Sequence, residues 1–155
     1  MHERPGETGR AARRSGHSSR GVGRTGAVKY LLDTHAVLWV AESSSRLSPR
    51  IRSLARSHAA DAFGVAAISL LEIVRKAHVG EITLTPDPAT WLDDLAHRFR
   101  ILPLTPAIAW RAVQLDWAHK DPADRLICAT ALEHELTLIS HDGEISRWGG
   151  VAVMW

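Results

Sequence analysis

The sequence of 155 residues contains one cysteine, Cys128, and lacks any long apolar run. A single cysteine cannot form an internal disulfide, and no second thiol is present to share a zinc ion. A membrane-spanning helix would need about 18 or more consecutive apolar residues, which this chain does not have. We therefore expect a protein of the cytoplasm without a membrane segment, in which Cys128 is a small buried hydrophobic residue.

Two further kinds of motif are missing. No P-loop lysine motif occurs, so the phosphate-binding loop of P-loop nucleotide-binding proteins is absent. The arginines near the beginning of the chain are not followed by the apolar core of a secretory signal. Chemistry that depends on a bound nucleotide cofactor is therefore not expected.

Only the beginning of the chain has a net positive charge. Residues 1–28 carry a net charge of +4, whereas residues 29–155 carry −2. The basic pI is therefore no evidence for a nucleic-acid-binding surface on the rest of the chain. Residues 1–27 are rich in Gly, Arg, Ser and Thr, with Val22 as the single large aliphatic residue, which predicts a disordered basic leader. This leader could be a flexible tail, the product of an upstream translation start, or a basic arm that contacts RNA phosphates.

Strand and helix patterns alternate over the remaining residues, 28–155. Short apolar stretches predict strands at 28–33, 62–67, 100–104, 137–140 and 151–154. Capping residues, prolines and apolar spacing predict helices that begin near Thr34, Ser48, Ser69, Ala89, Pro106 and Asp121. This alternation predicts a single α/β domain, a three-layer sandwich with helices on both faces of a mainly parallel sheet.

The segment Asp121-Pro-Ala-Asp124 places two carboxylates at the start of a helix that is predicted to be buried. Pro122 suits the first helical position, where its missing N–H costs nothing. Asp121 then becomes the N-cap, and Asp124 falls in the first turn. Two acids at a helix start either cap the helix or bind a cation, and this segment alone leaves both open.

Four acids from separate segments are expected to gather at one edge of the sheet. Asp33 ends the first predicted strand, and Asp142 follows the fourth. Glu72 and Asp124 lie in the first turns of helices that start on the same edge. In an open parallel sheet, ligands bind at the carboxyl ends of the strands. The four side chains are therefore predicted to surround a common site.

Each acid also has a simple local explanation. Asp33 could only cap a helix, Glu72 could form a capping box with Ser69, and Asp142 could belong to an Asp-Gly turn. Taken together these explanations are weaker, because like charges crowded at one edge repel. A hard divalent cation removes that repulsion. Oxygen ligands suit Mg²⁺ or Mn²⁺, and the lack of a Cys/His cluster argues against zinc.

Such a site would suit phosphate chemistry. Mg²⁺ held by a few carboxylates keeps open positions, so it can polarise a phosphoryl oxygen and activate a water molecule. Hydrolysis of a phosphodiester needs only this metal site, whereas hydrolysis of a nucleotide cofactor would need the missing phosphate loop.

Four segments resemble the signature segments of PIN-domain ribonucleases, and more closely those of the VapC toxins of bacterial type II toxin–antitoxin systems. They are Leu-Leu-Asp-Thr-His-Ala-Val-Leu-Trp at 31–39, Ile-Ser-Leu-Leu-Glu-Ile at 68–73, Asp-Pro-Ala-Asp-Arg-Leu-Ile-Cys-Ala-Thr-Ala at 121–131, and Leu-Ile-Ser-His-Asp at 138–142. The resemblance extends from about Lys29 to the C-terminus. It implies a PIN-like fold and an Mg²⁺- or Mn²⁺-dependent endoribonuclease that is dimeric and inhibited by a cognate VapB-type antitoxin.

The resemblance also implies roles for individual residues. Asp33, Glu72, Asp124 and Asp142 correspond to the catalytic acids of the family. Asp33 and Asp124 are expected to bind the metal directly, and Glu72 and Asp142 to complete the site or orient the water.

Three neighbouring residues are expected to support these acids. Asp121 would cap its helix and act as an outer acid. Ser140 would hydrogen-bond behind the metal ligands. Arg125 would pair with the acids, contact an RNA phosphate, or form a purely structural ion pair.

Other polar and aromatic residues are given simpler roles. His35, His119 and His141 lie near the proposed site and are expected at surface or helix-end positions, with a functional role as the alternative. Core packing or an antitoxin-facing position is expected for Trp39, Trp91, Trp110 and Trp117, with stacking on RNA bases as the alternative.

Alternative functions are a catalytically weak RNA-binding PIN-like domain and another metal-dependent phosphohydrolase. A haloacid-dehalogenase-type phosphatase would need Asp-x-Asp after its first strand, but this chain has Asp33-Thr-His. A receiver-like signalling domain would need an acid pair and a late lysine, and neither is evident.

Overall fold

The structure is a computed structural model that describes residues 26–155. Residues 1–25, which make up nearly all of the predicted basic leader, lie outside the described range, and so does the prediction that they are disordered. In the described part of the chain, no helix is long and apolar enough to cross a membrane.

A parallel sheet forms the centre of the molecule. Its strands are β1 (Tyr30–Leu32), β2 (Phe63–Ala66), β3 (Arg100–Leu102), β4 (Thr137–Ile139) and β5 (Val153–Met154). Their order is β3-β2-β1-β4-β5, and every strand pairing in the described residues is parallel. Leu31 of β1 aligns with Gly64 of β2 on one side and with Leu138 of β4 on the other. The predicted α/β class is confirmed.

Helices connect the strands. They are α1 (Thr34–Ala41), α2 (Pro49–Ser57), α3 (Ala67–His78), α4 (Pro88–Arg98), α5 (Pro106–Gln114), α6 (Pro122–Glu133) and α7 (Gly143–Trp148), with a 3₁₀ turn at Ala60–Ala62. All but α3 begin after a side chain that accepts hydrogen bonds from the first turn. These caps are Asp33, Ser48, Asp87, Thr105, Asp121 and Asp142. Such caps satisfy backbone N–H groups that have no partner within the helix.

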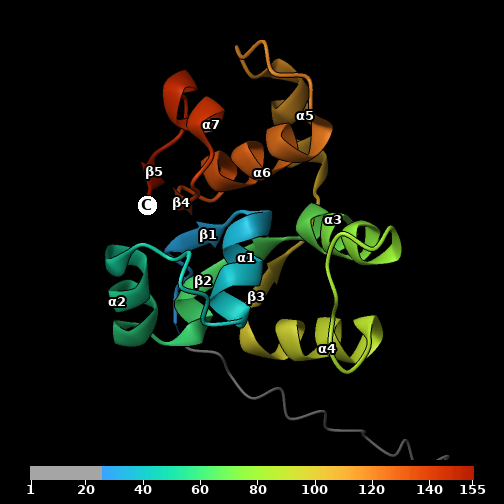
Figure 1. The fold of residues 1–155 in the computed structure, drawn as a ribbon. Helices are drawn as coiled ribbons and strands as arrows, with labels where there is room; N and C mark the ends of the chain where they lie inside the picture. Colours follow the sequence, from blue (N-terminus) through green and yellow to red (C-terminus); the bar gives the residue numbers. More distant parts are fainter. Residues whose placement is uncertain (1–25) are drawn as a thin grey trace, which may run out of the picture.

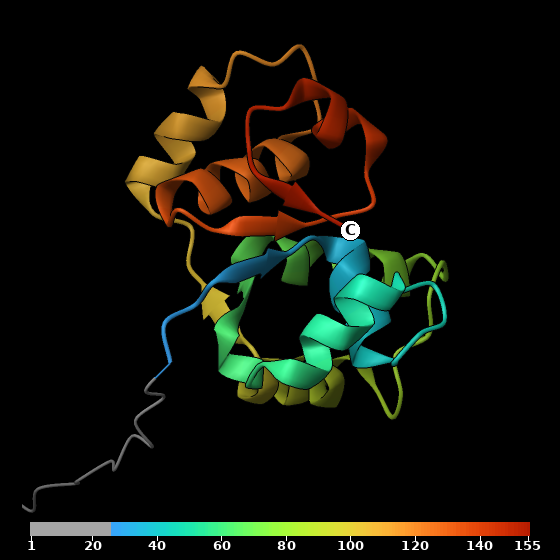
Figure 2. The ribbon, with the colours of Figure 1, turned by 90° about the vertical axis from the view of Figure 1, so that its left-hand side faces the viewer.

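The helices form two layers on opposite faces of the sheet (Figures 1 and 2), with α1, α2 and α4 on one face and α5, α6 and α7 on the other. Successive residues of β1 point to these two layers. Leu32 packs with α1, α2 and α4, and Leu31 packs with α6 and α7. Each is fully buried, which stabilises the fold by roughly 1.5–3 kcal/mol per side chain. The predicted three-layer sandwich is therefore confirmed.

Several local predictions were wrong. Helix α3 begins at Ala67 rather than Ser69, and its N-cap, Ala66, makes no side-chain hydrogen bond. The expected capping box between Ser69 and Glu72 is therefore absent, and Ser69 is fully buried. The short helix α7 was not predicted at all.

Candidate active site

The four predicted acids line one cavity at the carboxyl edge of the sheet. Asp33 follows β1, Asp142 follows β4, and Glu72 and Asp124 come from α3 and α6. The cavity has a volume of about 240 Å³ and is lined by Asp33, Thr34, His35, Glu72, Arg75, Lys76, Asp121, Asp124, Asp142 and Ile145. Because β1 lies between β2 and β4, segments that leave these three strands meet at one crevice.

Asp33 is the most enclosed of these acids, with 7% of its surface exposed. One carboxylate oxygen accepts the N–H of Ala36 at 2.7 Å, which caps α1. Burial raises the pKa of Asp33, although hydrogen bonds from Ser140 and Ala36 oppose the rise. Ser140 Oγ also accepts the N–H of Asp142 at 3.0 Å. The buried serine therefore links two acids, as expected for a supporting residue.

Glu72 is held by a residue next to Asp33. The hydroxyl of Thr34 donates a hydrogen bond to Glu72 Oε2. Thr34 Oγ1 also lies 3.2 Å from the hydroxyl oxygen of Ser69, and both residues are buried. Ser69 therefore contacts Thr34 and does not cap α3.

Asp124 contacts a histidine from the preceding loop. His119 Nε2 lies 2.6 Å from Asp124 Oδ2, and His119 Nδ1 lies 2.8 Å from Glu144 Oε2. Burial raises the pKa of Asp124, and the charges of Asp121 and Asp142 add to the rise, while the His119 bond opposes it. Burial lowers the pKa of His119, but Asp124 and Glu144 more than offset that effect, so its pKa is raised.

Asp142 and Asp121 each cap a helix. Asp142 Oδ1 accepts N–H groups of α7 from Glu144 at 2.6 Å and Ile145 at 3.1 Å. Asp121 Oδ1 accepts the N–H of Ala123 at 2.8 Å. The capping role predicted for Asp121 is confirmed, and its side chain also lines the acid cavity.

Arg125 differs from its expected roles. Its guanidinium donates five hydrogen bonds at 2.6–3.2 Å to the carbonyl oxygens of Ala112, Val113, Leu115, Trp117 and His119. An arginine has five N–H donors, so none is left for an acid or a phosphate. Arg125 therefore holds the chain between α5 and α6 in place, and neither of the expected ion pairs nor a free RNA-facing group is present.

Both the sequence and the fold are similar to those of known proteins. The family model described as the PIN domain matches residues 30–151. This chain belongs to the PIN-domain family. It is 42% identical over 113 residues to Ribonuclease VapC22 of Mycobacterium tuberculosis, a match that covers 72% of this chain and 85% of the relative.

Solved structures of similar fold include toxin–antitoxin complexes. DNA-bound VapBC from Salmonella typhimurium matches with a TM-score of 0.65 and 18% identity, over 82% of this chain and 97% of the other. FitAcB from Neisseria gonorrhoeae matches with a TM-score of 0.59 and 24% identity, over 81% and 96%. At these identities the likeness concerns the fold, and it supports the PIN-like architecture.

The chemistry of the acid cavity in this PIN domain fits a hard divalent cation. In residues 26–155, no three His, Cys, Asp or Glu side chains are close enough to form a ready-made metal cluster. The acids instead surround a cavity. Burial raises the pKa of Asp33 and of Asp124, and the charge of Asp142 adds to both shifts, as that of Asp121 adds to the shift of Asp124. Their donor atoms are all oxygens, the type that Mg²⁺ and Mn²⁺ prefer.

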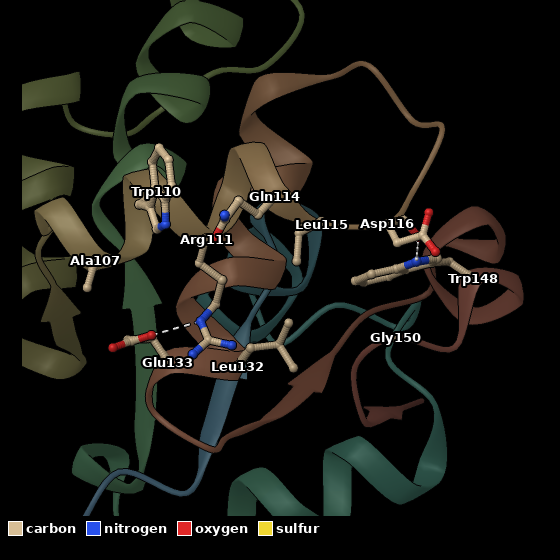
Figure 3. Close-up of a pocket in the computed structure, with 10 residues that line it drawn as sticks. All are labelled: Ala107, Trp110, Arg111, Gln114, Leu115, Asp116, Leu132, Glu133, Trp148 and Gly150. Atoms are coloured by element: carbon tan, nitrogen blue, oxygen red, sulfur yellow. Dashed lines mark hydrogen bonds and ion pairs between the residues drawn. The ribbon is translucent and has the colours of Figure 1, made fainter.

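A second cavity of the PIN domain is larger, at about 570 Å³ (Figure 3). It lies beside α5 and α6 and is lined by Ala107, Trp110, Arg111, Gln114, Leu115, Asp116, Leu132, Glu133, Trp148 and Gly150. Arg111 and Glu133 form an ion pair across it at 2.8 Å. None of the four catalytic-type acids lines this cavity, so its size does not make it the better candidate for phosphate chemistry.

The tryptophans have more varied positions than expected. Trp39 and Trp91 pack against the core, whereas Trp110 is 66% exposed. Trp117 packs against the second core cluster and also stacks on His119. His35 and His141 are exposed, as predicted, although both rings contact Trp39.

Three polar residues beside the acids were not singled out from the sequence as parts of the site: Thr34, His119 and Glu144. Thr34 directly follows Asp33, but the sequence marks it only as the start of a helix. The position of His119 shortly before the Asp-Pro-Ala-Asp segment predicts that it lies near the site, but not that it contacts Asp124. Glu144 belongs to α7, so its position could not be inferred without that helix.

Proposed function

We propose that this PIN-domain chain is the toxin component of a type II toxin–antitoxin system and hydrolyses RNA phosphodiester bonds as an endoribonuclease. The observation that carries the proposal is the convergence of Asp33, Glu72, Asp124 and Asp142, from four segments, on one cavity. The 42% identity to Ribonuclease VapC22 over most of both chains supports the choice of RNA as substrate.

The proposal includes dependence on Mg²⁺, with Mn²⁺ as a substitute. Asp33 and Asp124 would bind the ion directly, and Glu72 and Asp142 would complete the site or orient the attacking water. When bound, the ion supplies electrophilic polarisation of a phosphoryl oxygen and lowers the pKa of a bound water.

Other residues of the chain would prepare the acids for this role. Thr34 fixes Glu72, Ser140 joins Asp33 to Asp142, and His119 contacts Asp124. Arg75 lies on the rim of the same cavity, where its charge would attract an RNA phosphate. Arg75 and the cation held by the acids would together attract the phosphodiester, which the carboxylates alone would repel.

The proposal also includes a cognate VapB-type antitoxin, a homodimer and a location in the cytoplasm. Several proteins of similar fold were solved as VapBC complexes, among them VapBC2 from Rickettsia felis with promoter DNA. A partner of that kind would keep the nuclease inactive until the antitoxin is removed.

Growth arrest in bacteria tests the proposal. The full chain and its Asp124→Asn variant are expressed from an inducible promoter, and RNA 5′ ends are sequenced after induction. We expect the wild-type chain to stop growth and create new RNA ends, and Asp124→Asn to do neither at equal protein level. Asp93→Asn, which removes a charge on the exposed side of α4, is the matched control and should behave as wild type.

Two results would count against the proposal. If Asp124→Asn arrested growth as strongly as wild type, the toxic activity would not depend on the acid cavity. RNA binding without any new RNA ends would favour a catalytically weak RNA-binding domain.

A further inference from the structure

His119 bridges two carboxylates at the edge of the acid cavity. Its Nε2 contacts Asp124 at 2.6 Å, and its Nδ1 contacts Glu144 at 2.8 Å. Both ring nitrogens therefore contact a carboxylate, which fixes the orientation of the ring within its plane. The partners come from different helices, α6 and α7, so the imidazole also joins these two elements.

Among the described residues, each catalytic-type acid has its own hydrogen-bond donor. Backbone N–H groups hold Asp33 and Asp142, and the Thr34 hydroxyl holds Glu72. Asp124 has no such backbone donor among the described residues, because Asp121 caps α6 in its place. His119 is the one side chain of residues 26–155 that hydrogen-bonds to the Asp124 carboxylate. Without His119, that carboxylate would be free to rotate.

Aromatic stacking fixes the plane of the His119 ring. Trp117 stacks on it with ring centroids 4.4 Å apart and an angle of 20° between the planes. Trp148 stacks in turn on Trp117 at 4.8 Å and 16°. The Trp148 indole N–H donates to the Asp116 carbonyl oxygen at 2.8 Å (Figure 3). A Cβ at Gly150 would lie 2.2 Å from Trp148 Cζ2, so only glycine allows this close approach.

The backbone beneath the stack is also fixed. Arg125, the residue after Asp124, donates hydrogen bonds to the carbonyl oxygens of Trp117 at 2.6 Å and His119 at 3.0 Å. Helix α6 therefore contains both Asp124 and Arg125, and the Arg125 guanidinium holds the backbone of His119, the residue that contacts Asp124. Such double support is what a carboxylate needs if its position is to be set to within a fraction of an ångström.

We infer that His119 positions the Asp124 carboxylate in the acid cavity and that Glu144 anchors the imidazole that does so. His119 occupies Asp124 Oδ2, so Oδ1 remains for the cavity. The inference rests on the proposed function for the meaning of Asp124, but the contacts themselves do not depend on it. His119 acts through Asp124, so it is a positioning residue and not a catalytic one.

Side-chain length provides a sharp test. In His119→Gln the amide nitrogen can reach the place of Nε2 and still donate to Asp124. In His119→Asn the amide reaches only the place of Nδ1, so it can meet Glu144 but not Asp124. His119→Ala removes both contacts, and Glu144→Ala removes only the anchor. His134→Asn, at the exposed far end of α6, is the matched control.

Two measurements are made on each full-length variant at one pH. Mn²⁺ binding without RNA is followed by the loss of the free-ion EPR signal, and RNA cleavage supplies kcat and KM separately. Loss of a residue that orients a metal ligand weakens metal binding or activity by about 10–100-fold. We expect Mn²⁺ affinity and kcat to fall by that factor in His119→Asn and His119→Ala, with KM little changed. His119→Gln should retain most of the wild-type affinity and kcat, and Glu144→Ala should lose less of both than His119→Ala does.

Circular dichroism melting confirms that each variant is folded. Both His119→Gln and His119→Asn lose the stacked ring, so a difference between these two variants reports the positioning of Asp124 and not the packing of the ring. Wild-type Mn²⁺ affinity and kcat in His119→Asn would overturn the inference, as would equal losses in Gln and Asn. A wild-type protein that binds no Mn²⁺ would also overturn it. If wild type binds Mn²⁺, His119→Asn does not, and neither cleaves RNA, the inference stands while the proposed function fails.

Discussion

The hydroxyl of Thr34 donates a hydrogen bond to the carboxylate of Glu72, 38 residues further along the chain. The contact joins the start of α1 to the first half of α3, because β1 and β2 are neighbours in the sheet. The hydroxyl oxygen of the buried Ser69 lies 3.2 Å from Thr34 Oγ1. A residue that directly follows one acid of the cavity thus holds another acid in place.

Removing this hydroxyl should impair RNA cleavage more than it impairs folding. Thr34→Val keeps the shape of the side chain but leaves Glu72 without its donor, so we expect kcat to fall by about 10-fold or more. Thr34→Ser keeps the hydroxyl and should retain most of the activity. Steady-state cleavage of a fluorogenic RNA measures both variants. Equal activity of Val and Ser would show that the hydrogen bond has no part in the reaction.

Arg125 should be essential for stability. Lysine in its place has one ammonium group and cannot reach five carbonyl oxygens, so several would lose a charged donor. Charge-assisted hydrogen bonds stabilise a fold by roughly 1.5–3 kcal/mol each, and such losses do not add fully, so we expect Arg125→Lys to cost about 3 kcal/mol. Urea unfolding measures this cost. Arg50→Lys on exposed α2 is the control, expected within about 0.5 kcal/mol of wild type.

A free energy of unfolding for Arg125→Lys equal to that of the control would contradict the structural role of Arg125. That result would favour the roles that the sequence predicts for Arg125, an ion pair or a contact with an RNA phosphate.

Much of the fold was predictable because its signals are local. Strand stretches such as 28–33 are short and apolar, and Ser48 and Asp121 each stand before a proline that opens a helix. Helix α7 escaped prediction because six residues are too few to establish an apolar period. The Ser69–Glu72 spacing suggested a capping box, but the backbone is already helical at Ala67 and the serine side chain is buried.

The candidate site was predictable for a different reason. Parallel strands place their carboxyl ends at one edge, so the meeting of Asp33 and Asp142 follows from topology. The partners of Asp124 and Arg125 do not, because they depend on the path of the loop between α5 and α6. No sequence period describes that loop, and only its coordinates reveal that five carbonyl oxygens face one guanidinium.

Cys128 should be unreactive in the folded protein. It is fully buried in α6, and burial raises the pKa of its thiol from 9.0 to about 12, with the charge of Asp124 adding to the rise. Because thiolates react and thiols do not, we expect a disulfide reagent to label Cys128 at pH 8 only at the rate of unfolding. Rapid labelling without denaturant would contradict this burial.

The same thiol should make the fold less stable in alkali. Between pH 9 and 12 the unfolded chain releases the Cys128 proton while the folded chain keeps it, so unfolding is favoured as the pH rises. Below pH 9 both states hold the proton, and the thiol has no effect on the pH dependence. We expect the fall in the free energy of unfolding above pH 9 to be shallower in Cys128→Ala. Identical slopes would mean that the thiol does not titrate differently in the two states.

Asp33 provides the most direct test of the acid cavity, because asparagine can also cap α1 and leaves the fold intact. The measurement is cleavage of an RNA panel by purified wild type and Asp33→Asn, each with EDTA, Mg²⁺ or Mn²⁺. We predict that wild type cleaves RNA with Mg²⁺ or Mn²⁺ and not with EDTA, and that Asp33→Asn loses at least about 100-fold in kcat. Equal cleavage by the two proteins, or full wild-type cleavage in EDTA, would contradict this prediction.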